Sequence, residues 1–302
     1  MNDYSNQMML KKEIIKIYNN DKDTENYNNT FLLENEHISI DLNKIKKVYS
    51  LSKKLRLEIM TFDTSEKFIN IEIDPFGYVN SKREKKDGIT YFGYNVEKDG
   101  GNIPIDYALK NNDNYFYEDS FNGRHFMIKF NPDDLNYYVK DLGRGFGTFI
   151  KIQEWTELKN NLLLNIGENY IVFSLGEDDE EEEENEKEFN DKNENSLNIK
   201  IFSVNTQQKV YKFLPSDCPI TIGRSNDNNI FIDDDMLSRI HCTIDYNNEK
   251  WYVNDGFAKN GIQEEEIKKS TNNSWIYAYD EIPITDRMVF KANHNLFICN
   301  LI

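Results

Sequence analysis

Short runs of alternating apolar and polar residues cover much of the chain and predict β-strands. In segment 197–201 the apolar residues Leu, Ile and Ile alternate with Asn and Lys, and similar short runs begin at Ile220, His241, Trp251 and Leu296. Turn-forming clusters such as SNDNN and DYNNEK separate these runs, with no ten-residue helical period between them. This pattern is typical of an all-β sandwich or barrel.

The N-terminal part of the chain has the same pattern of short strand-like runs, and it contains a second copy of a segment of the C-terminal part. Strand-like runs begin at Lys54, Phe68 and Tyr170. The stretch His125–Asp141 resembles His241–Asp255, because each starts with a histidine, crosses a polar turn and ends with two aromatic residues, Val, a polar residue and Asp. The two lengths differ in the turn, where hairpins tolerate insertions. We therefore expect two copies of one β-sandwich.

A strongly acidic segment separates the two copies. Segment 177–196 contains the run EDDEEEEENEKEFNDKNEN, which holds a single aromatic residue. Such a run cannot bury enough apolar surface to offset the entropy lost on ordering. We expect a disordered linker there, between one sandwich over residues 50–176 and another over 197–302, with residues 1–49 as an N-terminal extension.

The net charge of −17 limits the classes of partner. Lys and Arg number 36 against 53 Asp and Glu, so a phosphate polymer or an anionic membrane would be repelled over most of the surface. No apolar run approaches the roughly 18 residues needed to span a bilayer, and the first residues lack the pattern of a signal peptide. The three cysteines lie far apart in apolar strands, which indicates buried thiols in a reducing compartment. We expect an intracellular protein, cytoplasmic or nuclear, that binds neither nucleic acid nor membranes, and the sequence leaves its oligomeric state open.

Four short motifs follow one another in the C-terminal copy. The run ITIG leads into Arg224, an S-R-x-H motif begins at Ser238, a W-x-V-x-D strand begins at Trp251, and an S-T-N-N-S loop begins at Ser270. In this order and spacing the motifs resemble the forkhead-associated (FHA) domain, an eleven-stranded β-sandwich that binds phosphothreonine peptides through loops at one end. The resemblance covers residues 197–302.

The resemblance implies a phosphopeptide site made of two loops. Arg224 and Ser238 would hold the phosphate, with Arg239 beside them. Thr271 and Asn272 would lie on the opposing loop, where Asn272 would bond to the main chain of the peptide. These residue types suit the chemistry, because the forked donors of arginine match a phosphate and an amide can both donate to and accept from a main chain.

The position of the second loop has an alternative. The pair Asn260-Gly261 also looks like the Asn-Gly pair of the family, but choosing it would leave an overlong segment before the strand near Ile284. We therefore place the loop at Ser270–Ser274 and treat Gly256–Lys269 as an insertion. Asn273 then stands where the family has Gly, which is tolerable because Asn also adopts left-handed backbone conformations.

The N-terminal copy departs from the family pattern at the binding positions. Tyr94 stands where the arginine belongs, Asn122 where the serine belongs and Phe146 where the loop asparagine belongs. We expect this copy to fold without binding phosphothreonine, and its aromatic residues to serve in core packing. In the C-terminal copy the resemblance gives His241 a structural role, bracing the loop.

The sequence thus predicts a non-enzymatic adaptor whose C-terminal copy recognises phosphothreonine on a partner protein. No HExxH motif, G-x-S-x-G motif or Cys/His ligand spacing is present, so we expect no catalytic residues, metal site or cofactor. The alternative is a structural scaffold whose sandwiches bind unphosphorylated partners. Of two fragments, 197–302 is expected to bind a phosphothreonine peptide and 50–176 is not.

Overall fold

A computed structural model describes residues 41–61, 68–83, 87–94, 104–109, 123–176, 195–203 and 206–302. Among these, residues 151–276 form one compact unit, and residues 41–150 together with 277–302 form another. We call the first the inner sandwich and the second the outer sandwich, after their order along the sequence. Residues 1–40 of the expected extension, residues 177–194 of the expected linker and Asn122 lie outside the described residues.

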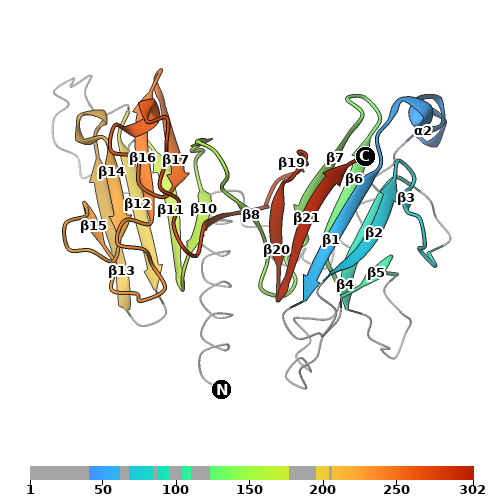
Figure 1. Cartoon of the computed structure of the whole chain (residues 1–302), viewed down its shortest axis with the longest axis horizontal. Coiled ribbons are helices and arrows are strands. Elements are labelled where there is room, and N and C mark those ends of the chain that lie inside the picture. The colour runs from blue at the N-terminus through green and yellow to red at the C-terminus, as the bar shows by residue number, and fades with distance from the viewer. Residues whose placement is uncertain are drawn as a thin grey trace, which may run out of the picture. The chain divides into compact units, whose positions relative to one another are not determined.

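Two sheets form the outer sandwich (Figure 1). The helices α2 (Leu42–Val48) and η2 (Tyr49–Leu51) precede them, and no helix in the described ranges is long and apolar enough to cross a membrane. The first sheet has the strand order β8 (Thr148–Lys151), β20 (Val289–Ala292), β21 (Asn295–Leu301), β1 (Leu55–Thr61), β2 (Ile69–Asp74) and β3 (Gly77–Tyr78). The second has the order β19 (Ile282–Pro283), β7 (Asn136–Asp141), β6 (Gly123–Asn131), β4 (Ile89–Tyr94) and β5 (Tyr107–Ala108).

The core of the outer sandwich is rich in phenylalanine. Phe92, Phe126, Phe290 and Phe297 are fully buried. Phe92 stacks on Phe126 with ring centroids 4.4 Å apart, and Phe290 stacks on Phe297 at 4.6 Å. Phe126 also meets Phe297 edge to face at 5.3 Å. Offset and edge-to-face pairs of this kind stabilise a core beyond the area that they bury.

The inner sandwich also has two sheets, around a mainly aliphatic core. One sheet has the strand order β13 (Thr206–Phe213), β12 (Leu197–Ser203), β11 (Asn169–Leu175), β10 (Leu162–Ile166) and β18 (Ser274–Tyr277). The other has the order β15 (Ile230–Phe231), β14 (Ile220–Gly223), β16 (Cys242–Asn247), β17 (Lys250–Asp255) and β9 (Thr156–Glu157). The short helices η4 (Pro215–Asp217) and η5 (Gly261–Gln263) lie in connections. The core side chains include Leu164, Ile171, Ile199, Ile222 and Val253.

Each sandwich is closed by a hairpin from the other repeat. The strands β10 and β11 follow the N-terminal copy in sequence, but they pair with β18 and β12 of the inner sandwich. The strands β20 and β21 end the C-terminal copy, but they pair with β8 and β1 of the outer sandwich. In Figure 1 the green β11 lies beside the yellow β12, and the red β21 lies beside the blue β1. The two repeats have therefore exchanged their closing hairpins.

The all-β class, the two sandwiches and the repeated hairpin are confirmed, but the units differ from the expected boundaries. In both copies the residue after the histidine pairs with the final Asp, Phe126 with Asp141 and Cys242 with Asp255. Segments 151–176 and 277–302, however, each belong to the opposite sandwich from the one expected. Alternating apolar residues identify a strand and its buried face, but they do not say which of two similar sheets the strand joins.

Candidate binding site of the inner sandwich

The Gly-Arg loop leaves the end of β14 and lies against the S-R-x-H segment. The backbone N–H groups of Arg224 and Ser225 donate to the carbonyls of Ser238 and Arg239, each at 3.1 Å. A Cβ atom on Gly223 would collide with the Arg239 carbonyl, so this close approach requires glycine. The Arg224 and Arg239 side chains are exposed, and within the described part of the chain neither guanidinium group forms an ion pair.

The second loop, Ser270–Asn273, is held at its base by Asp255, which is fully buried at the end of β17. One carboxylate oxygen accepts hydrogen bonds from the hydroxyls of Ser270 and Ser274, at 2.6 and 2.9 Å. The other accepts from the Ser270 N–H at 3.2 Å. Asn273 has a φ of 61°, the left-handed conformation that we expected at the glycine position.

Direct hydrogen bonds join the two loops. The Thr271 N–H donates to the Ser238 hydroxyl oxygen at 3.0 Å, and the two hydroxyl oxygens lie 3.5 Å apart. The Asn272 amide donates to the Met236 carbonyl at 2.6 Å. Thr271 and Asn272 are exposed and Ser238 is half-buried. The structure thus brings together the predicted residues of both loops at one end of the sandwich.

The buried His241 ring connects the same loops from the core side. Its Nδ1 accepts from the Ser238 N–H at 3.1 Å, which leaves Nε2 to carry the proton and donate to the Asn273 carbonyl at 3.1 Å. Burial lowers the pKa of His241, although the Asn273 carbonyl and the carboxylates of Asp255 and Asp234 oppose that shift. A neutral ring fits this pair of hydrogen bonds, and its position allows it to brace both loops.

Asn260, the alternative loop asparagine, lies in the insertion and away from these contacts. Its backbone N–H and its side-chain amide both donate to Glu264, at 3.1 and 3.0 Å. A β-bridge between Phe257 and Lys268 closes the insertion. Of these two candidates, Asn272 is the one bonded to the segment that carries Ser238.

At the corresponding end of the outer sandwich, the residues at the binding positions contact other residues of the same sandwich. The Tyr94 ring packs edge to face on His125 at 4.9 Å, and burial raises its pKa to about 12. The Phe146 N–H donates to the side chain of Asn293 at 2.8 Å, and the Phe146 ring packs on His294. These aromatic side chains fill the places of the arginine and the asparagine.

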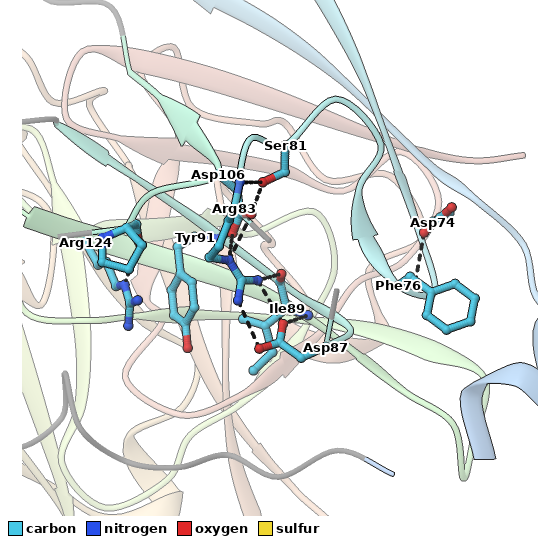
Figure 2. Close-up of polar contacts among 10 residues, drawn as sticks. Asp74, Phe76, Ser81, Arg83, Asp87, Ile89, Tyr91, Asp106 and Arg124 are labelled. Carbon is cyan, nitrogen blue, oxygen red and sulfur yellow. Dashed lines mark hydrogen bonds and ion pairs between the residues drawn. The ribbon is translucent and has the colours of Figure 1, made fainter. Parts of the chain in front are cut away.

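Two arginines of the outer sandwich are engaged in contacts within that sandwich (Figure 2). Arg83 is almost fully buried and forms ion pairs with Asp87 at 2.8 Å and Asp106 at 3.0 Å. The Arg124 guanidinium lies over the Tyr91 ring, 3.7 Å from its centroid, in a cation–π contact. Both guanidinium groups therefore stabilise the fold of the outer sandwich.

Sequence reasoning missed Asp234 and Met236. The Asp234 carboxylate accepts from the Met236 N–H at 2.7 Å, and the Met236 carbonyl accepts from Asn272. An Asp that bonds the N–H two residues ahead forms an Asx turn, so the D-D-D-M sequence before Ser238 held a local signal for it.

Comparison with known families identifies the repeat. A sequence model of the FHA domain matches residues 102–167 and again residues 220–282. Each match starts in one sandwich and ends in the other, because it runs past the exchange points after Ile150 and Ile276. No curated protein matches the chain. FHA domains are in general non-enzymatic interaction modules that bind phosphopeptides, and no cluster of possible metal ligands occurs among the residues that the structure describes.

Proposed function

Because the chain carries two FHA domains in tandem, we propose that its inner sandwich binds a phosphothreonine peptide and that the protein is a non-enzymatic adaptor. The observation that supports this most is the joining of the two loops through Ser238, Thr271 and His241. That arrangement leaves two exposed arginines beside short neutral donors, which is the set of groups that a phosphate monoester requires.

Each residue has a distinct role in this proposal. Arg224 supplies the fixed cation with forked donors, and Arg239 adds a second positive charge. The Ser238 oxygen accepts from the Thr271 N–H, and its own O–H, which makes only a long bond of 3.5 Å to the Thr271 hydroxyl, can turn to donate to a phosphate oxygen. The side-chain amide of Asn272 donates one hydrogen to the Met236 carbonyl. The second hydrogen and the oxygen of that side-chain amide can bond the peptide main chain.

The outer sandwich is proposed to be a structural or protein-binding module. Tyr94 and Phe146 bring no positive charge to the two loops. A dianionic phosphate that loses water without gaining a fixed cation is not stabilised.

Phosphate dependence of binding tests the proposal in the full chain. Fluorescence polarisation would compare a phosphothreonine peptide library with its matched threonine library. Arg224→Ala should weaken phosphopeptide binding by roughly 10- to 100-fold, because a charge-assisted hydrogen bond contributes about 1.5–3 kcal/mol. Arg224→Lys should retain part of the affinity, and Arg56→Ala, which removes a positive charge from the outer sandwich, should change it little.

The two asparagines provide a second, matched comparison. Asn272→Ala should weaken binding strongly, whereas Asn260→Ala should leave it unchanged, since Asn260 bonds Glu264 within the insertion. The reverse order would show that the loops are assigned wrongly. Equal binding of both libraries by the unmodified chain would favour the alternative, a scaffold that binds unphosphorylated partners.

A further inference from the structure

The loop that carries Ser238 contacts the hairpin that comes from the N-terminal repeat. We call residues 233–239 the recognition loop. At the turn between β10 and β11, the Glu168 N–H and the Asn169 side-chain amide donate to one oxygen of Asp234, at 3.1 and 2.7 Å. A Cβ atom on Gly167 would lie only 2.5 Å from that oxygen. The turn therefore approaches the recognition loop as closely as a glycine allows.

A continuous set of hydrogen bonds leads from this turn to the binding residues. The second oxygen of Asp234 accepts from the Met236 N–H at 2.7 Å, and the Asp234 carbonyl accepts from the Leu237 N–H at 3.0 Å. The Met236 carbonyl in turn accepts from Asn272 at 2.6 Å. One carboxylate thus ties the turn to the part of the loop that fixes Asn272.

A cavity lies beside the contact between the turn and the loop. Its volume is about 390 Å³, with Glu168, Asn169, Asp234 and Met236 among its lining residues. Asn169 itself is buried, and its side-chain oxygen Oδ1 accepts from the Ser203 hydroxyl. This bond orients the side-chain NH₂ group of Asn169 toward Asp234. Leu237 of the loop packs in the core, whereas residues 233–236 line the cavity, and the bonds through Asp234 join this polar part of the loop to the turn.

We propose that the turn Gly167–Asn169 positions the phosphopeptide site, acting through Asp234 on Met236 and Asn272. This inference rests on the function proposed above and adds that the N-terminal repeat completes the site of the C-terminal repeat. The C-terminal repeat's own hairpin has Asn293 at the corresponding turn position, with a φ of 53° against 54° at Gly167. A Cβ atom at the Gly167 position would lie 2.5 Å from an oxygen of Asp234, so an asparagine there would force this contact apart.

Binding measurements on the full chain test this positioning role. Asn169→Ala and Asp234→Ala should each weaken binding of a phosphothreonine peptide about 3- to 10-fold, as expected for the loss of an intramolecular hydrogen bond. Glu266→Ala, which removes an exposed carboxylate from the insertion, should change nothing. If Asp234 acts through Asn272, then Asp234→Ala should cause no further loss in an Asn272→Ala background. Independent, additive losses would overturn the proposal.

Amide hydrogen exchange gives a readout that needs no peptide. In Asn169→Ala the Met236 amide should exchange faster, whereas the Ser270 amide, bonded to Asp255, should keep its protection. An unchanged Met236 amide would overturn the positioning role even if phosphopeptide binding is real. Faster exchange in a chain that does not distinguish the two libraries would support the coupling and refute only the proposed function. Should Asp234→Ala fail to fold, Asp234→Asn keeps the side-chain volume and one acceptor.

Discussion

The two sandwiches share a hairpin register and a buried histidine, yet they use the end that carries this histidine in opposite ways. In the inner sandwich His241 accepts from Ser238 and so fixes a loop whose other polar groups remain exposed. In the outer sandwich His125 instead contacts the amide of Asn293, whose oxygen accepts from Phe146. The comparison shows that the scaffold alone does not make a site. Binding requires loop groups that the fold leaves for a ligand.

The exchanged hairpins show a second difference between the sandwiches. The outer core has stacked phenylalanines, and its hairpin supplies Phe290 and Phe297 to them. The inner core is mainly aliphatic, and the hairpin that it receives supplies Leu164 and Ile171 at the corresponding positions. Because close-packed cores tolerate changes of volume poorly, each hairpin matches the sandwich that it enters better than it would match its own repeat.

The largest expected effect comes from where the chain is cut. The fragment 151–276 contains every described strand of the inner sandwich except Tyr277, the last residue of β18, so it should unfold cooperatively and bind the phosphothreonine peptide. The fragment 197–302, which the sequence analysis expected to bind, lacks β9, β10 and β11 and should do neither. Calorimetry and fluorescence polarisation on both fragments check this. Cooperative folding and binding by 197–302 would show that each repeat can close with its own hairpin.

Truncating a core side chain in either hairpin should destabilise the sandwich that the hairpin enters. The effect should be smaller than that of the chain cut. All three tryptophans (Trp155, Trp251 and Trp275) lie within 151–276, so tryptophan fluorescence reports on the inner sandwich. Ile171→Ala, in the N-terminal repeat, should destabilise that transition by about 2–5 kcal/mol. Phe297→Ala, in the C-terminal repeat, should leave it nearly unchanged, because Phe297 is buried in the outer sandwich.

Far-ultraviolet circular dichroism supplies the complementary signal for Phe297→Ala, since it also follows the outer sandwich. The exchange would be refuted if Phe297→Ala shifted the tryptophan transition and Ile171→Ala did not. Both variants remove fully buried side chains, so each serves as the control for the other.

The sequence predicted the parts of this molecule that depend on local chemistry. The strands, the hairpin register after each histidine, and the left-handed Asn273 follow from alternation, turn composition and backbone preference. The exchange could not be predicted, because β11 and β21 carry the same alternation and differ only in side-chain volume against distant partners. Asp234 was missed for a similar reason, since its contact with the turn at Asn169 joins residues far apart in sequence.

Acidification should give the smallest effect, a difference in the stability of the inner sandwich between the unmodified chain and a variant without His241. Burial lowers the pKa of His241 from its usual 6.5. Its contribution to stability is therefore fully present above pH 6.5 and is lost as the pH falls below that value, because the unfolded chain takes up a proton that the folded ring resists. The inner transition, followed by tryptophan fluorescence, should thus lose more stability between pH 7.5 and about 5.5 in the unmodified chain than in His241→Asn. The carboxylates titrate in both proteins, so the difference isolates the histidine. Parallel pH profiles would show that the ring is not held neutral between the loops.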